Sequence, residues 1–313
     1  LIDTFACHLI HTFWIFFSGG IFHGRNGDDT HIRYAADILV CCFRAAENIY
    51  ADANARLSCF LHACDMFEIH PYDTRVKGEK NLNEKFIRQI NDNLKEKKTM
   101  RFAFISDTQR WYDETEDMVA DINARGDVDF VIHGGDLSDF GATHEFVLQR
   151  DIMLGFQMPW VALLGNHDCL GTGEDVFEVI WGDPNFYFQA GNVLFICLNT
   201  NCMEYDYSEP VPDLSFLEKL MKNLPEGVEK TVVAMHVSPY DREFNNNVAN
   251  VFQLYLKEFP NLQFCLNGHA HKYVIHEPFN DGIFYYQTPC AKERGYILFT
   301  ITEDGYEQEL IEY

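Results

Sequence analysis

The sequence offers no apolar run of the length that a membrane-spanning helix needs, which is about 20 residues. The run at residues 9–22 spans 14 residues and contains His11. The ten cysteines show neither the short regular spacing of a disulfide scaffold nor a C-x-x-C zinc pair. Cys197 and Cys265 lie within apolar runs, so we expect buried free thiols rather than a disulfide framework.

Positive charge is scarce. The chain carries 24 Lys and Arg against 48 Asp and Glu, and residues 101–313 carry 12 against 35, a net charge of −23. An acidic surface repels polyphosphate backbones, so we expect no binding of a long nucleic acid through a basic groove. A small phosphorylated ligand held by metal stays compatible with this charge. The hydrophobic content of 47% and the aromatic content of 15% exclude a disordered chain.

Residues 1–63 are expected to be a leader, cleaved in the mature protein, or a non-native extension. The stretch R-L-S-C-F-L-H-A-C, residues 56–64, resembles a bacterial lipoprotein cleavage signal in which Cys64 would be lipidated. This interpretation predicts a periplasmic or cell-surface lipoprotein that touches the membrane only through its lipid anchor. The alternative is an ordinary cysteine in a cytoplasmic protein.

Residues 64–99 are expected to hold a linker and an amphipathic helix. From Asn81 onward, apolar residues recur every four positions, at Leu82, Phe86, Ile90 and Leu94. Lysines at 95, 97 and 98 suit the negative end of such a helix. The main domain then covers residues 100–313.

Five strand-like segments of this domain end in polar residues. The first three span 101–106, followed by Asp107 and Gln109; 128–135, followed by Asp136; and 159–165, followed by Asn166 and His167. The last two span 231–235, followed by His236, and 262–268, followed by His269 and His271. Helical segments separate the first three, as at 114–126, which predicts parallel strands that share one rim. Open α/β sheets bind ligands along that rim.

Each of these motifs has an ordinary structural explanation when taken alone. A Gly-Asp after a strand is usually a turn, G-N-H-D at 165–168 could also be a turn, and a lone His236 could be a core histidine. The H-x-H pair would project both rings to one face if it lay in a strand. Jointly, the pattern favours a metal site. Carboxylate, carboxamide and imidazole without thiolate suit Mn, Fe or Zn ions, and the number of ligands suggests two ions with one bridging carboxylate.

The five motifs resemble those of the calcineurin-like metallophosphoesterases, namely D-x-H, G-D-x-x-D, G-N-H-D/E, a lone His after a strand, and G-H-x-H. Here they read D-T-Q at 107–109, G-D-L-S-D at 135–139, G-N-H-D at 165–168, His236, and G-H-A-H at 268–271. The resemblance spans roughly residues 100–300. With the C-terminal strands and a hairpin turn at Asp304-Gly305, we expect an α/β fold, a four-layer α-β-β-α sandwich of two mixed sheets.

The resemblance also implies roles for the individual residues. Asp107 and His271 would bind the first metal ion, and Asn166, His236 and His269 the second, with Asp136 bridging the two. Gln109 stands where the family has an imidazole. As a poorer donor it would weaken the first site or favour Mn²⁺ or Mg²⁺ there, unless it only hydrogen-bonds the Asp107 loop.

The implied mechanism uses a hydroxide that bridges the two ions and attacks phosphorus in line. His167 would stabilise or protonate the leaving oxygen, and Asp168 would orient its ring. The loop at 199–213 is expected to form a rim or lid, or else a solvated connector. Arg242 would contact a phosphate, or else pair locally. His133 and His144 match no motif and are interpreted as structural.

The expected function is hydrolysis of phosphoric esters in a small phosphorylated substrate or a phosphoprotein. A phosphomonoesterase, including a Ser/Thr-type protein phosphatase, is preferred from the sequence. The alternatives are a phosphodiesterase of small nucleotides or lipids, and a non-catalytic protein on the same fold that binds one metal ion.

Overall fold

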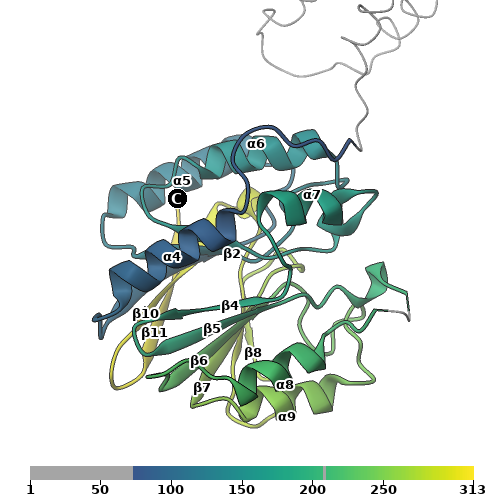
Figure 1. Cartoon of the computed structure of the whole chain (residues 1–313). Coiled ribbons are helices and arrows are strands. Elements are labelled where there is room, and N and C mark those ends of the chain that lie inside the picture. The colour runs from purple at the N-terminus through teal and green to yellow at the C-terminus, as the bar shows by residue number, and fades with distance from the viewer. Residues whose placement is uncertain (1–72, 207–208) are drawn as a thin grey trace, which may run out of the picture. The chain divides into compact units, whose positions relative to one another are not determined.

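A computed structural model of the protein describes residues 73–206 and 209–313. Two mixed sheets pack face to face, and helices cover the outer face of each (Figure 1). The expected four-layer sandwich is therefore confirmed. The proposed leader at 1–63 and the proposed lipidation site Cys64 lie outside the described residues. No helix within the described ranges combines the length and the apolarity that crossing a membrane requires.

The first sheet has the strand order β11-β10-β1-β2-β3. Its strands are β1 (Met100–Ile105), β2 (Phe130–His133), β3 (Trp160–Ala162), β10 (Gly295–Ile301) and β11 (Tyr306–Glu312). Strands β1, β2 and β3 are parallel, and α5 (Tyr112–Arg125) and α6 (Thr143–Met153) connect them. Helix α5 ends at Gly126, which adopts the left-handed conformation with a φ of 69°. The predicted strand and helix succession is confirmed.

The second sheet has the order β4-β5-β6-β7-β9-β8. Its strands are β4 (Phe186–Ala190), β5 (Val193–Leu198), β6 (Lys230–Met235), β7 (Leu262–Asn267), β8 (Val274–His276) and β9 (Tyr285–Gln287). Helices α8 (Leu214–Lys222) and α9 (Ala249–Lys257) pack on its outer face. Short 3-10 turns stand at η1 (His167–Cys169), η2 (Cys202–Glu204) and η3 (Ala291–Glu293).

Helix α4 (Leu82–Leu94) closes one edge of the sandwich. Its four predicted apolar residues are all buried, as expected. The helix packs against the edge strands β3 and β4, one from each sheet. Asn83 exchanges two hydrogen bonds of 2.9 Å with the backbone of Ala162 in β3, so a side chain satisfies the open strand edge. Helix α7 (Gly173–Ile180) joins the apolar layer on the outer face of the first sheet.

Successive side chains of β1 point to opposite faces of the sheet and so contribute to two apolar layers. Phe102 and Phe104 point between the sheets, whereas Ala103 and Ile105 join the layer under the helices. Phe102 stacks on Phe130 and meets Phe195 of the second sheet edge-on, with ring centroids 5.1 and 5.4 Å apart. The two sheets are thus joined largely by aromatic contacts, which accounts for the high aromatic content.

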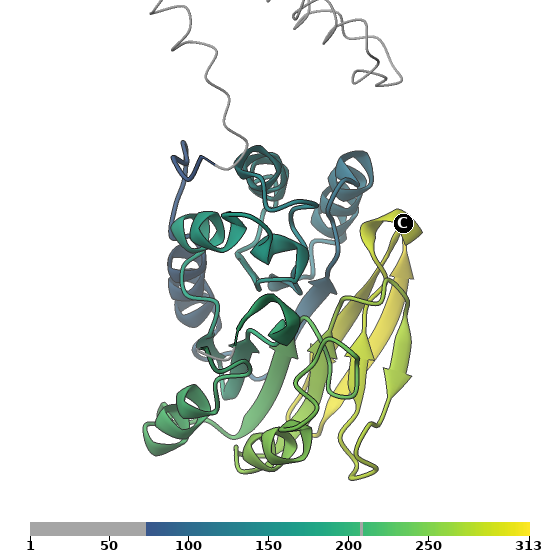
Figure 2. The same ribbon diagram turned by 90° about the vertical axis from the view of Figure 1, so that its right-hand side faces the viewer.

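The C-terminal hairpin and the cysteines agree with the sequence. Strands β10 and β11 are antiparallel and run side by side to the C-terminus (Figure 2). Thr302 N donates to Gly305 O at 2.9 Å across the tight turn that was expected at Asp304-Gly305. Cys197 and Cys265 are buried free thiols, as predicted.

The His-x-His pair does not lie in a strand, because β7 ends at Asn267. His269 and His271 lie in the following loop, both with left-handed backbone, at φ 75° and 59°. The loop conformation, rather than strand alternation, sets where their rings point.

The inter-sheet contact generates a stability prediction. We expect Phe102→Ala to lower the free energy of unfolding by about 3–5 kcal/mol, because it opens a cavity between the sheets. Phe140→Ala serves as the matched control, since Phe140 is 60% exposed, and its cost should stay within about 0.5 kcal/mol. Urea unfolding followed by circular dichroism measures both. Equal losses for the two variants would contradict the central role of Phe102.

Candidate metal centre

The polar residues at the five strand ends converge from both sheets. Asp107, Asp136 and Asn166 follow β1, β2 and β3 of the first sheet, and His236 follows β6 of the second. His269 and His271 follow β7, the neighbour of β6. The carboxyl ends of both sets of parallel strands therefore meet at one rim of the sandwich, as open α/β sheets lead one to expect.

Four of the converging residues have strained backbone. Asp107 and Asp136 share the left-handed conformation of the two loop histidines, with φ of 55° and 61°. Non-glycine residues adopt this region rarely, and they cluster at functional sites when they do. The strain here coincides with the side chains that the motifs single out.

Two glycines permit the close approach of the loops. A Cβ on Gly165 would lie 2.2 Å from Asp136 Oδ1, and a Cβ on Gly268 would lie 2.7 Å from Asp107 Oδ2. No side chain fits at either position without displacing a carboxylate. The glycines in G-N-H-D and G-H-A-H are therefore needed for the geometry of the neighbouring ligands.

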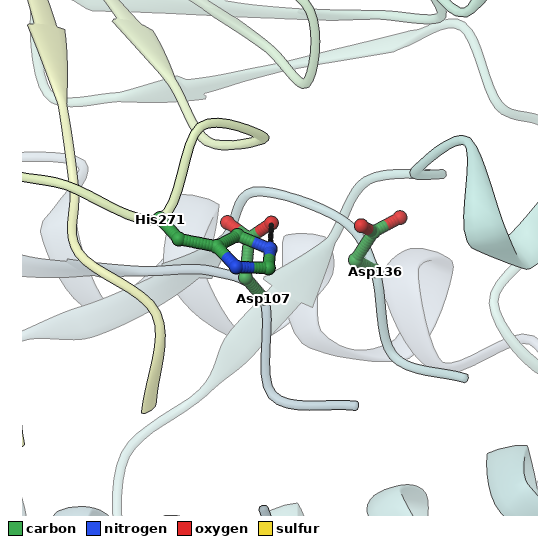
Figure 3. A group of neighbouring side chains, drawn as sticks. All are labelled: Asp107, Asp136 and His271. Atoms are coloured by element: carbon green, nitrogen blue, oxygen red, sulfur yellow. Dashed lines mark ion pairs between the residues drawn. The ribbon is translucent and has the colours of Figure 1, made fainter. Parts of the chain in front are cut away.

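A first group of donor atoms consists of Asp107, Asp136 and His271, whose ligand atoms all lie within 4.8 Å of one another. Figure 3 shows His271 lying against Asp107, with Asp136 on the neighbouring loop. His271 Nε2 is 3.3 Å from Asp107 Oδ1, and this contact raises the pKa of His271 above its usual range. Two carboxylates and an imidazole form a donor set that suits a divalent cation.

Gln109 lies beside this first group and carries an unsatisfied oxygen. Its Nε2 donates to Asp136 Oδ2 at 3.2 Å. Its Oε1 is buried and accepts no hydrogen bond from any described residue. Because a buried acceptor without a partner is costly, a cation at this point would satisfy it. The amide therefore bonds to Asp136 rather than to the Asp107 loop, and its role as a metal ligand stays a prediction.

A second group of donor atoms surrounds Asn166. His236 Nε2 lies 3.0 Å from Asn166 Oδ1, and His269 Nδ1 lies 3.1 Å from the same oxygen. His236 Nε2 is also 3.4 Å from Asp136 Oδ1. His236 Nε2 thus lies near an amide oxygen and a carboxylate oxygen, and His269 shares the amide oxygen. Zinc, iron and manganese accept these kinds of donor.

Asp136 belongs to both groups, since Oδ2 faces Gln109 and Oδ1 faces His236. Burial opposes its charge, but His236 outweighs burial and lowers the pKa of Asp136 to about 2. Burial likewise lowers the pKa of His236, but Asp136 and then Asp107 outweigh it and raise that pKa to about 10. The carboxylates therefore create a negative potential at His236, which would equally attract a metal cation.

Buried partners orient the two histidines that lie below the rim. His236 Nδ1 pairs with Gly134 O at 2.8 Å, which leaves Nε2 facing Asn166. His133 pairs with Thr108 Oγ1 at 2.9 Å and accepts from Gly135 N at 3.1 Å. Burial lowers the pKa of His133 to about 3, so it is neutral. The interpretation of His133 as structural agrees with these contacts.

Asp168 does not orient His167, and that expectation is wrong. Its carboxylate accepts hydrogen bonds from the backbone N–H groups of Asp136, Leu137, Ser138 and Gly165 and from Ser138 Oγ, at 2.8–3.2 Å. Burial and then the charge of Asp136 raise the pKa of Asp168 to about 7, against the opposing effect of these donors. Asp168 is therefore a positioning residue for the Asp136 loop.

Asp139 orients His167 instead, although the sequence analysis assigned Asp139 no role. His167 Nδ1 lies 2.8 Å from the backbone oxygen of Asp139 and 3.7 Å from its Oδ1. Arg110 forms an ion pair with the Asp139 carboxylate. The side chain of His167 is 35% exposed, so a substrate can reach it. The sequence contained a signal for this role, because Asp139 is the second aspartate of the motif G-D-L-S-D.

A hollow of about 450 Å³ opens beside Asn166, and Met203, Glu204, Arg242 and Glu243 complete its lining. Met203 and Glu204 lie in the 199–213 loop, so that part of the loop is a rim, as expected. The side chain of Arg242 is 89% exposed, and its Nη2 lies 3.4 Å from Glu243 Oε1. Arg242 thus pairs locally, and its contact with a phosphate stays a prediction.

The hydrogen bonds to Asp168 generate a second prediction. Asp168→Asn should lower the free energy of unfolding by about 2 kcal/mol or more, because an NH₂ group would face buried N–H donors. Metal affinity should fall with it, since Asp136 loses its support. Asp175→Asn, a change in the first turn of α7, is the matched control and should leave both quantities near wild type. Wild-type stability and metal affinity in Asp168→Asn would contradict the positioning role.

Comparison with known proteins agrees with this geometry. The chain is 28% identical over 205 residues to a 3′,5′-cyclic-nucleotide phosphodiesterase of Nostoc sp., an alignment that covers 61% of this chain and 74% of that protein. Two solved structures are similar in fold, and each superposition covers 68% of this chain and 51% of the other chain. Purple acid phosphatase from yellow lupin has 13% identity and a TM-score of 0.52. The 5′-nucleotidase from Candida albicans has 12% identity and a TM-score of 0.51.

The family model for calcineurin-like phosphoesterases matches residues 100–273, more than half of the chain. That range contains all five motifs. The protein therefore belongs to the calcineurin-like phosphoesterases, hydrolases that act on phosphoric ester bonds.

Proposed function

We propose that the protein is a phosphoesterase with two metal ions, and that its substrate is a small phosphodiester. The observation that carries the proposal is the position of Asp136 between two separate groups of donor atoms. Asp107, Gln109, Asp136 and His271 would hold the first ion. Asp136, Asn166, His236 and His269 would hold the second.

The donor chemistry supports Mn, Fe or Zn as the metal. The second group has two imidazole nitrogens, which suit zinc, iron and manganese alike. The first group is richer in oxygen because Gln109 replaces an imidazole, which favours a harder ion such as Mn²⁺. Bound there, the pair of ions would supply activation of water and neutralisation of the phosphoryl oxygens.

His167 is the group proposed to act on the leaving oxygen. Because Nδ1 is engaged by the Asp139 carbonyl, Nε2 is the ring atom that can serve a substrate. The backbone N–H of His167 donates to Asp136 Oδ1 at 3.0 Å, which ties the ring to the shared carboxylate. A single bend of the chain thus places the proposed acid beside the proposed metal pair.

A diester is favoured over the monoester that the sequence alone suggested. The supporting observation is the relative from Nostoc sp., a cyclic-nucleotide phosphodiesterase at 28% identity. The hollow beside Asn166 has room for a small organic group next to the metal centre. Diesters of small nucleotides are the substrates proposed first. A Ser/Thr-type phosphatase activity on phosphoproteins is the second candidate.

Metal content tests the proposal directly. Wild-type protein reconstituted with Mn²⁺ should bind two ions per chain, by elemental analysis after dialysis. His271→Ala and His236→Ala should each keep one ion, and Asp136→Ala should keep fewer than one, since it serves both groups. His144→Ala is the control, because that histidine is exposed on α6, and should keep two ions.

Hydrolysis completes the same test. The protein with two ions should cleave bis(p-nitrophenyl) phosphate faster than p-nitrophenyl phosphate, and chelation should abolish both activities. One ion per chain and no turnover in the wild type, with both restored by Gln109→His, would instead indicate a binding protein whose first metal site was lost. Faster cleavage of the monoester would contradict the proposed diesterase and would support the phosphomonoesterase that the sequence suggested.

The role of His167 gives a separate prediction. His167→Ala should lower turnover by about 10²- to 10⁴-fold, as expected for loss of general acid catalysis, while the protein keeps its two ions. Steady-state kinetics and elemental analysis on the same preparation measure both, with His144→Ala again as control. Loss of the metal together with activity would show that the role assigned to His167 is wrong.

A further inference from the structure

We propose that Glu204 and Glu243 are specificity-determining residues, which make the site discriminate against substrates with two negative charges. The inference rests on the proposed function and deepens it, since it states why a phosphodiester, and not a phosphomonoester, is the substrate. The two carboxylates come from different loops and line the same hollow beside Asn166. We call this pair the acidic collar.

The acidic collar lies close to the reacting centre. Glu243 Oε2 is 3.7 Å from His269 Nε2, the ring edge opposite the Nδ1 that faces Asn166. Glu204 lies near enough to Glu243, His167 and Asp136 to interact with their charges. A phosphate bound at the metal centre would therefore lie among the charges of both carboxylates.

The position of Glu204 is fixed by the fold. It ends the η2 turn, and its N–H donates to Asn201 O at 3.2 Å. Asn201 is buried and donates from Nδ2 to Leu164 O at 2.9 Å, directly after β3. The turn that carries Glu204 is thus anchored to the same loop that carries Asn166 and His167. The backbone of Glu204 cannot move away from the centre without breaking these bonds.

The nearby positive charge does not cancel the acidic collar. Among the described residues that line the hollow, Arg242 is the one cation. Its side chain is 89% exposed, and its Nη2 lies 3.4 Å from Glu243 Oε1. A third carboxylate, Asp241, lies 3.7 Å from His269 Nε2 through Oδ1. The balance on this side of the centre is negative.

Phosphomonoesters and phosphodiesters differ in their negative charge at neutral pH. A phosphomonoester carries between about 1.5 and 2 negative charges at pH 7, whereas a phosphodiester carries one. Each carboxylate at several ångströms from the extra charge should weaken monoester binding roughly 3- to 10-fold, given the high effective dielectric of a partly open site. The monoester product of diester cleavage gains this second charge, so the same carboxylates favour its release.

The test compares Glu204→Gln, Glu243→Gln and the double variant with wild type. For Mn²⁺-loaded protein, we expect the ratio of monoester to diester kcat/KM to rise roughly 3- to 10-fold in each single variant and further in the double variant. The substrates are p-nitrophenyl phosphate and its bis ester. Glu307→Gln, an exposed position on β11 in the other sheet, is the matched control and should leave the ratio unchanged.

A binding measurement keeps the inference separate from the proposed function. Titration calorimetry with phenylphosphonate and diphenylphosphinate, whose P–C bonds resist hydrolysis, gives the affinity ratio of a dianion to a monoanion without turnover. A raised ratio in the variants supports the acidic collar even if wild-type protein cleaves neither ester, in which case the proposed function alone fails. An unchanged affinity ratio would overturn the inference while diester cleavage stands. A changed ratio with fewer than two ions per chain would also overturn it, since metal loss would be the cause.

Discussion

The candidate metal centre depends on the hydrogen bonds that the buried carboxylate of Asp168 accepts from the surrounding backbone. The carboxylate accepts from three successive N–H groups, those of Asp136, Leu137 and Ser138, and from Gly165 N at the start of its own loop. These bonds join the ends of β2 and β3, and they hold the backbone of Asp136 in a left-handed conformation. A charged acceptor of several N–H groups is a strong anchor, and its burial makes the donors dependent on it.

Hydrogen bonds and His236 together explain how three carboxylates can stay close to one another at this rim. Asp107, Asp136 and Asp168 are all fully or almost fully buried. N–H donors satisfy Asp168, His269 N donates to both oxygens of Asp107, and Asp136 faces His236 and Gln109. The backbone thus pre-organises the carboxylates for a cation, and Gln109 Oε1 remains as a buried acceptor without a partner among the described residues.

The strain in the ligand loops is balanced by the packing beneath them. Left-handed residues cost free energy, of order 1–3 kcal/mol each, and they occur here at the ends of strands whose other residues are almost completely buried. The aromatic contacts between the sheets, centred on Phe102, hold those strand ends at one rim. The acidic collar of Glu204 and Glu243 lies outside this packing, because neither residue is buried.

The sequence by itself determined helix α4, the five strands that precede the motif residues, and the residue types at the ends of those strands. Apolar periodicity was enough to find α4 and the five strands, because burial leaves a regular trace along the chain. Periodicity could not reveal that Asp168 bonds to the Asp136 loop rather than to the adjacent His167. The tight turn at η1 points the side chains of these two neighbours in different directions. Nor could periodicity show Asp139 beside His167, or His269 and His271 in a loop. Those facts depend on left-handed backbone and on contacts between distant segments, which only the packed tertiary structure decides.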